Sequence, residues 1–408
     1  MRSSAAQFDP AMARELVEFA VDLDAQDDRN GERRARRRES TLSASRASSS
    51  PAADSIYLPQ YGDRWQMLVD TRKQYSDGTG RSSASEPSWN PDDPDCNGFG
   101  PFANAWILAN GNPAAAPDVY ASPPTYVVAI RGTVFSDRPS VVEDVFADTI
   151  AAHHLVRPWR GMALPLVFAQ LPGAEIHAGF GYACLSLLFD RRFGLVRALQ
   201  AIAQQEARIV LTGHSQGAAM ATLIHAFLHY ASRSGPTLGA KRLHLTSYVF
   251  AQPKPGNALF AADFDRLLLH GGDSFTINNS LDPVPEVPLT RQSLGDLRGD
   301  FPAGSRIDRL VNAFGRPARL LRHVLFSQMD RQIVELMRSE DLVLDPGGAV
   351  SCRARACKFA AGSSLNYSPA GTPVPLIGDA DAAYPGQDPR DAFVQHHSPT
   401  YRELLARR

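Results

Sequence analysis

The chain has 408 residues, of which 44% are hydrophobic and 21% are charged, a composition typical of globular proteins. Lysine plus arginine (42) nearly balances aspartate plus glutamate (43), for a formal net charge of -1, which argues against nucleic acid as the main partner and favours a neutral or apolar ligand. No stretch approaches the roughly 18 consecutive apolar residues that a membrane-spanning helix needs, and residues 1–26 lack the apolar centre of a secretory signal. We therefore expect a soluble chain that is cytoplasmic, or exported without a recognisable cleaved signal.

Residues 1–53 are predicted to form a mobile N-terminal extension, and residues 54–408 the folded domain. Within the extension, residues 12–23 are amphipathic, residues 29–40 form the basic run RNGERRARRRES, and residues 41–55 are the low-complexity stretch TLSASRASSSPAADS. The last two segments lack the apolar residues needed to build a core. The basic run is typical of a solvated tail, and contact with a membrane surface or a nucleic acid is the alternative.

From about residue 104 onward, apolar runs of strand length are bounded by turn residues. The runs are AWILAN, TYVVAI, ARIVLT, LTSYVFA and SFTINN, and a helical stretch, residues 216–234, separates the third from the fourth. This alternation predicts an α/β fold with a mostly parallel central sheet covered by helices. Residues 293–345 have apolar residues at helical spacing, so we expect a helical insertion there that is either a cap over the sheet edge or a partner surface.

The clearest chemical motif is RIVLTGHSQGAAMATL at residues 208–223. A strand leads directly into Gly213-His214-Ser215-Gln216-Gly217 and out into a helix, which is the context of the nucleophile elbow in α/β-hydrolases. We expect the two glycines to allow close packing of strand and helix, and the backbone N–H of Gln216 to face a developing oxyanion. His214 is interpreted as packing support that points away from the nucleophile. Ser215 is the predicted nucleophile.

A second oxyanion donor is expected after an earlier strand. The strand TYVVAI ends in Arg131-Gly132-Thr133, where the backbone N–H and the hydroxyl of Thr133 could both reach an oxyanion, although the same tripeptide also fits an ordinary turn. The following stretch, SVVEDVFADTIA, predicts a helix that is either a lid or a packed element. Its apolar face carries Val141, Val142, Val145, Phe146 and Ile150.

The acid and the base follow the serine in chain order in this architecture. Asp282 comes directly after the strand SFTINN, although Asp-Pro is also a common turn. Of the 11 histidines, His323, His396 and His397 lie after Asp282. His323 lies within a predicted helix among arginines, which disfavour the imidazolium that a general base must become. His396 and His397 lie in a loop directly before Ser398-Pro399, a plausible helix start, so one of them is the expected base.

The sequence predicts no metal and no cofactor. Four cysteines are too few for a disulfide scaffold in a chain of 408 residues. Cys352 and Cys357 could close a small loop or stay reduced, and no second Cys or Cys/His pair lies near them to complete a zinc site.

Five segments resemble blocks of the class 3 lipases, a family of the α/β-hydrolase superfamily typified by fungal triacylglycerol lipases. They are VVAIRGT, IHAGFGYA, LTGHSQGAAMATL, YVFAQPKPGN and NNSLDPVPEVP, and together with the C-terminal dozen residues they span roughly residues 104–290 and the chain end. The resemblance implies an α/β-hydrolase fold, a triad of Ser215, Asp282 and a C-terminal histidine, an oxyanion hole of Thr133 and Gln216, and a lid near residues 141–150.

The activity implied by this resemblance is that of a serine ester hydrolase, a lipase or carboxylesterase acting on acyl esters of lipids through an acyl-enzyme intermediate. Relatives commonly end in a histidine followed a few residues later by a tyrosine that starts the last helix, and the spacing to Tyr401 favours His397 as the base. A phospholipase, including a toxin-like effector, is the alternative within the enzymes, and a non-catalytic binding protein on the same fold is the alternative outside them. A lipid substrate with transient contact to a lipid interface is the expected partner, and the oligomeric state stays open.

Overall fold

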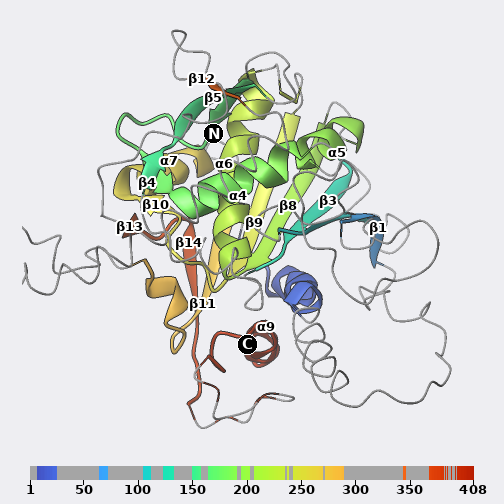
Figure 1. Cartoon of the computed structure of the whole chain (residues 1–408). Coiled ribbons are helices and arrows are strands. Elements are labelled where there is room, and N and C mark those ends of the chain that lie inside the picture. The colour runs from blue at the N-terminus through green and yellow to red at the C-terminus, as the bar shows by residue number, and fades with distance from the viewer. Residues whose placement is uncertain are drawn as a thin grey trace, which may run out of the picture.

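The structure is a computed structural model that describes residues 7–24, 64–71, 104–111, 123–132, 149–157, 164–190, 194–202, 206–234, 237–238, 242–269, 272–288, 343–345, 367–380 and 393–408, with the single residues 382, 384, 387 and 391. Its centre is a seven-stranded sheet in the order β1-β2-β3-β8-β9-β11-β14 (Figure 1). The strands are β1 (Trp65–Asp70), β2 (Trp106–Gly111), β3 (Thr125–Ile130), β8 (Glu206–His214), β9 (Arg242–Phe250), β11 (Gly272–Asn279) and β14 (Thr372–Leu376).

The strands β3, β8, β9, β11 and β14 are parallel to one another, whereas β1 pairs with β2, and β2 with β3, in antiparallel fashion. The register pairs Ile130 with Gly213 and Ile277 with Phe250, so the carboxyl ends of these strands meet at one edge of the sheet. Loops at this edge of an open α/β sheet are where ligands usually bind. The predicted α/β class and the mostly parallel sheet are confirmed.

Side chains along the central strands alternate between two hydrophobic cores, because successive strand residues point to opposite faces. In β3, Val128 and Ile130 belong to one core, Val127 and Ala129 to the other, and all four are fully buried. A strand buried on both faces needs a continuous apolar run, which explains why TYVVAI is apolar nearly throughout and does not alternate with polar residues.

Helices cover the first of these cores, and two of them, α4 and α6, lie in front of the strands in Figure 1. The bounds are α4 (Ala178–Phe189), α5 (Leu195–Ile202), α6 (Gln216–Ser234) and α7 (Ala258–Leu268). Helix α6 has the bounds that the sequence predicts. Its small side chains, including Ala218 and Ala221, are fully buried, which lets the helix lie close to β8 and β9.

The second core is covered by a helix at residues 10–24 and by α9 (Ser398–Ala406), which lie side by side below the sheet in Figure 1. Arg402 of α9 pairs with Glu18 of the N-terminal helix at 3.7 Å. Leu16, Phe19 and Leu23 are fully buried in this core. The prediction of a mobile extension up to residue 53 is therefore wrong for this helix, because its apolar face completes the core beneath the sheet. Its basic run and low-complexity stretch lie outside the described residues.

Two smaller sheets lie beside the main one, in the orders β13-β10-β7-β4 and β12-β5-β6. Their strands are β4 (Thr149–Ala151), β5 (His153–Arg157), β6 (Leu164–Val167), β7 (Glu175–His177), β10 (Gly256–Asn257), β12 (Val343–Asp345) and β13 (Tyr367–Ser368). Two predicted helices therefore end in strands. The last residues of the predicted helix SVVEDVFADTIA form β4, and the last residues of the predicted helical insertion 293–345 form β12. The rest of the predicted insertion, residues 293–342, and the four lid residues Val141, Val142, Val145 and Phe146 lie outside the described residues.

Within the described ranges, no helix combines the length and the apolar composition that crossing a membrane would require.

Candidate active site

Ser215 lies in a sharp turn between β8 and α6. Its φ of 57° is in the left-handed region, which costs a non-glycine residue roughly 1–3 kcal/mol and persists only where the surroundings hold it. The Ser215 N–H donates to the carbonyl of Phe250 at 3.0 Å, and α6 begins at the next residue, Gln216. The predicted turn from strand to helix is present, with a strained serine at its tip.

Both glycines of the motif are required by close backbone contacts. A Cβ on Gly213 would lie 2.5 Å from the backbone of Gly217, and a Cβ on Gly217 would lie 2.3 Å from the carbonyl oxygen of Ile130. Backbone atoms of neighbouring elements cannot yield as the end of a flexible side chain can. The close approach of β3, β8 and α6 thus depends on glycine at these two positions.

Asp282 follows β11, as the sequence predicts, and its carboxylate accepts several hydrogen bonds. Oδ1 accepts from the backbone N–H of Val284 at 2.9 Å. Oδ2 lies 2.9 Å from Nδ1 of His396 and accepts from the hydroxyl of Tyr401 at 2.7 Å. The Tyr401 hydroxyl in turn accepts from the backbone N–H of Asn279 at 3.0 Å, so α9 and the end of β11 hold the acid together.

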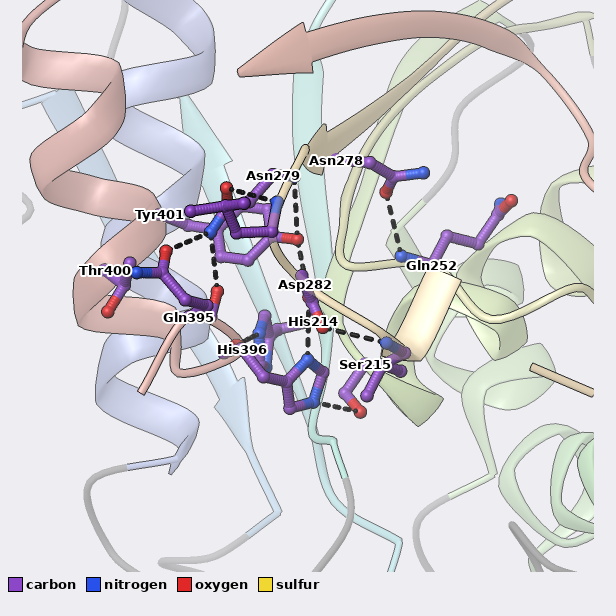
Figure 2. Close-up of polar contacts among 12 residues, drawn as sticks. His214, Ser215, Gln252, Asn278, Asn279, Asp282, Gln395, His396, Thr400 and Tyr401 are labelled. Atoms are coloured by element: carbon purple, nitrogen blue, oxygen red, sulfur yellow. Dashed lines mark hydrogen bonds and ion pairs between the residues drawn. The ribbon is translucent and has the colours of Figure 1, made fainter. Parts of the chain in front are cut away.

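His396, and not His397, lies between the acid and the serine (Figure 2). Nε2 of His396 is 2.9 Å from the Ser215 hydroxyl oxygen, and the residue is only 2% exposed. His397 instead pairs with Asp391 at 2.7 Å at the surface. The prediction that His397 faces the serine is therefore wrong, because the turn directs the two adjacent side chains to opposite surroundings.

The charges and hydrogen bonds around His396 suit a general base. Burial lowers the pKa of His396 below its ordinary value of 6.5, against the opposing effect of Asp282. Burial alone would raise the pKa of Asp282, but the hydrogen bonds from His396, Val284 and Tyr401 bring it below 3.8. At neutral pH the acid is thus a carboxylate that accepts from Nδ1–H, which leaves Nε2 of a neutral imidazole free to accept the serine proton.

The surroundings of the serine also contain donor positions for an oxyanion. Gln216 provides a backbone N–H at the N-terminus of α6, where the helix dipole favours negative charge. Gly132 lies beside the serine, since a Cβ built on it would be 3.6 Å from the Ser215 Cβ. Its neighbour Thr133, the other predicted donor, lies outside the described residues.

Sequence reasoning missed the contacts of two residues near the triad. Tyr401 was noted for its spacing only, yet its hydroxyl binds the acid. His214 does not merely support packing: its ring lies 4.8 Å from that of His396, and its nitrogens contact Asp24 and the His396 carbonyl. The sequence does not reveal the contact between His214 and Asp24, because the contact depends on where the N-terminal helix packs.

The described residues contain no group of three or more His, Cys, Asp or Glu side chains that could hold a metal ion. Cys184 is buried and its thiol donates to the carbonyl of Met220 at 3.8 Å, and the pair Cys352 and Cys357 lies outside the described residues.

A parallel sheet, a strained serine at a strand-to-helix elbow and a buried His–Asp pair beside it define an α/β-hydrolase fold. The sequence model of the family described as Lipase (class 3) matches residues 127–292, which include the elbow and Asp282. This part of the chain is similar to the class 3 lipases.

Individual proteins with similar sequences are known from fungi. The secreted mono- and diacylglycerol lipase LIP4 of Malassezia restricta is 31% identical over 160 residues, which cover 39% of this chain and 46% of the relative. The secreted mono- and diacylglycerol lipase MDL4 of Malassezia globosa is 28% identical over 187 residues, covering 45% of this chain and 54% of the relative. The chain thus spans about half the length of the curated relatives it matches.

Similar solved structures include two lipases. The M37 lipase aligns over 75% of this chain and 74% of its own, with a TM-score of 0.41 and 20% identity. The lipase from Rhizopus microsporus var. chinensis aligns over 46% of this chain and 52% of its own, with a TM-score of 0.31 and 23% identity.

Proposed function

We propose that the protein is a serine ester hydrolase that cleaves acyl esters of lipids. The observation that carries the proposal is the continuous hydrogen-bonded chain from the Ser215 hydroxyl through His396 to the Asp282 carboxylate, with distances of 2.9 Å at both links. A serine, a base within hydrogen-bond reach and an acid that orients the base are the parts of an activated nucleophile. The strained backbone of Ser215 supports this role, because such strain is typical of functional sites.

The mechanism follows from this geometry. Nε2 of His396 takes the proton of Ser215 as Oγ attacks the ester carbonyl, and Asp282 stabilises the imidazolium that forms. The tetrahedral intermediate collapses, the C–O bond to the alcohol breaks, and His396 returns the proton to the leaving alkoxide. Water then attacks the acyl-Ser215 ester by the same steps and releases the carboxylic acid.

The oxyanion is proposed to bind the backbone N–H groups of Gln216 and Thr133. Gln216 begins α6, and Gly132, the neighbour of Thr133, lies beside the serine. Each such donor contributes roughly 10²-fold or more in rate. The stretch with Val141, Val142, Val145 and Phe146 is proposed as a lid over the site, which rests on the apolar pattern and the family resemblance.

The substrate and the location of the protein are proposed from the family. The Malassezia relatives are named as lipases of mono- and diacylglycerols and as secreted proteins. Partial glycerides are therefore the first substrates to test, with transient binding to a lipid interface, and export is the first location to test.

The test measures hydrolysis of acyl esters of rising chain length, as monomers and as micelles, alongside mono-, di- and triacylglycerols and glycerophospholipids. We expect hydrolysis of neutral acylglycerols, with a rate increase above the critical micelle concentration if a lid opens at the interface. Preference for glycerophospholipids would replace the proposal by a phospholipase.

A fluorophosphonate probe separates the enzyme from a non-catalytic binding protein. We expect covalent labelling of the wild type and none of Ser215→Ala, with the same thermal unfolding for both proteins. Equal absence of labelling and of hydrolysis in the two proteins would contradict the enzyme reading.

A further inference from the structure

The buried histidine of the elbow, His214, makes contacts that the triad mechanism does not use. Its Nδ1 lies 3.1 Å from Oδ2 of Asp24, and its Nε2 lies 2.6 Å from the carbonyl oxygen of His396. The side chain is only 5% exposed. A ring so placed links the end of the N-terminal helix to the backbone of the residue that contacts the nucleophile.

Both partners of His214 are hydrogen-bond acceptors. A carboxylate and a peptide carbonyl accept but do not donate, so both ring nitrogens must carry a proton, and the ring is an imidazolium. Burial alone would lower the pKa of His214, but the charge and the hydrogen bond of Asp24 raise it. The buried ring and the half-buried Asp24 carboxylate thus form an ion pair, and the ring donates its second proton to the His396 carbonyl.

This carbonyl belongs to the peptide that carries the His396 side chain. The backbone N–H of His396 donates to Phe393 at 2.8 Å, and the carbonyl accepts from His214, so both sides of the residue are fixed. The direction of the side chain toward Ser215 and Asp282 depends on this backbone orientation. A displacement of about 1 Å at a reacting group can cost roughly 10²-fold in rate.

Asp24 is the last residue of the helix at residues 10–24, and this helix is firmly seated. Leu16, Phe19 and Leu23 are fully buried against the sheet. The Asp24 side chain is 27% exposed, and its carboxylate also lies near Gly132, where a Cβ would be 3.5 Å from Oδ1. The helix therefore presents one carboxylate to the interior of the active site.

We propose that Asp24 and His214 are a positioning pair that holds the backbone of His396 so that its imidazole faces Ser215. The inference rests on the proposed function, because it assigns the pair a role in the same hydrolysis. Asp24 acts through His214, whose ring contacts the His396 carbonyl, and is therefore a positioning residue. The N-terminal helix, which lies outside the matched family region 127–292, is in this way a part of the active site.

Two substitutions of His214 separate its two contacts. In His214→Gln the side-chain amide can take the place of Nε2–H and donate to the His396 carbonyl. In His214→Asn the shorter amide can take the place of Nδ1–H and keep only the contact with Asp24. We expect His214→Asn to lower kcat about 10- to 100-fold with little change in KM, as for a misplaced catalytic group, and His214→Gln to retain most of kcat.

Asp24 is tested with a matched control on the same helix. Asp24→Ala is expected to lower kcat about 10-fold, the loss that accompanies an imperfectly held base. Glu18→Gln, which removes a carboxylate that pairs with Arg402 instead, is expected to leave kcat unchanged. Because Asp24 acts through His214, the double variant with His214→Asn should lose no more than His214→Asn alone.

The pH profile adds a readout that a purely structural role would not move. The groups that face the His214 ring are Asp24, His396 and Tyr401, with Asp282 acting at longer range. His214→Gln removes the positive charge nearest to His396 and leaves Asp24 unpaired, and both changes favour protonated His396. The acid limb of kcat/KM should therefore move to higher pH.

A measurement independent of turnover keeps this inference separate from the proposed function. In protein labelled with ¹⁵N-histidine, the downfield proton shared by His396 and Asp282 should be lost or shifted in Asp24→Ala and His214→Asn, and unchanged in Glu18→Gln. An unchanged signal in the first two variants overturns the positioning pair even if the protein hydrolyses esters. A lost signal supports the pair even if no ester is cleaved, in which case the proposed function alone fails.

Discussion

His396 and His397 are neighbours in the chain with opposite environments. His396 is 2% exposed and contacts Ser215 and Asp282, whereas the side chain of His397 is 37% exposed and pairs with Asp391. His397 can therefore be the control for substitutions of His396, because the same change at the neighbouring position leaves the contact with Ser215 in place.

The pair predicts unequal effects of the same substitution. His396→Ala should lower kcat about 10⁴-fold or more, because it removes the base that accepts the Ser215 proton. His397→Ala should change kcat by no more than about twofold, as expected for a surface substitution. Steady-state hydrolysis of one ester by both variants is the measurement, and equal losses would contradict the assignment of His396.

The pH dependence of the wild type follows from the environment of His396. Hydrolysis needs the neutral imidazole, so activity falls as pH drops through the pKa of this residue. Burial holds that pKa below 6.5, and the acid limb of kcat/KM in the free enzyme should therefore have its midpoint below pH 6.5. A midpoint above pH 7 would mean that Asp282 outweighs the effect of burial.

Residue types and chain order singled out Ser215 and Asp282, which the structure brings to the same histidine, but they did not distinguish His396 from His397. The elimination of His323 used only the local sequence, and the spacing to Tyr401 favoured the wrong member of the doublet. The choice depends on a contact with a residue far away in sequence, because His214 binds the carbonyl of His396, 182 residues away. His397 pairs instead with the nearby Asp391. No local pattern contains that information.

At the scale of elements, the contact between β3, β8 and α6 decides the geometry of the elbow. The backbone of Gly217 approaches the carbonyls of Ile130 and Arg131, so the helix starts where a side chain would not fit. The sequence predicts this contact well, because glycines on both sides of a serine between a strand and a helix have a steric meaning.

Gly217→Ala should therefore damage both stability and activity. The added methyl would lie 2.3 Å from the Ile130 carbonyl, and overpacking of this kind costs roughly 1–3 kcal/mol or more. Gly272→Ala is the matched control, because its added methyl would lie farther from its neighbours, 3.1 Å from His225 Nε2 and 3.2 Å from the Leu245 carbonyl oxygen. Urea unfolding and ester hydrolysis of both variants test the difference, and similar stabilities would contradict the steric account.

At the scale of the whole molecule, the sheet is a layer between two cores, and each core needs helices from distant parts of the chain. The first core is covered by α4 to α7, of which α6 has the bounds that the sequence predicts. The second is closed by residues 10–24 and by α9. The amphipathic pattern of residues 12–23 was visible in the sequence, but the arginine run that follows it suggested a tail, and only the tertiary packing shows what its apolar face covers.

Truncation of this helix face should destabilise the fold. Phe19 is fully buried and packs edge-on against Trp65 at 6.2 Å between ring centroids, so Phe19→Ala should cost about 3–5 kcal/mol of unfolding free energy. Arg14→Ala on the exposed side of the same helix should cost less than about 0.5 kcal/mol. Denaturant unfolding measures both, and a small effect of Phe19→Ala would show that the helix contributes little to the fold.

The sequence separation of 181 positions between Ser215 and His396 has a consequence for biosynthesis. A chain still held on the ribosome can complete β8, the elbow and α6 while residues 396–405 remain inside the exit tunnel. At that stage Ser215 lacks its contact with His396, and α9 does not yet cover the second core beside the helix at residues 10–24. The contact between Ser215 and His396 can form only after α9 has emerged and packed beside the N-terminal helix, so the proposed site is assembled late in synthesis.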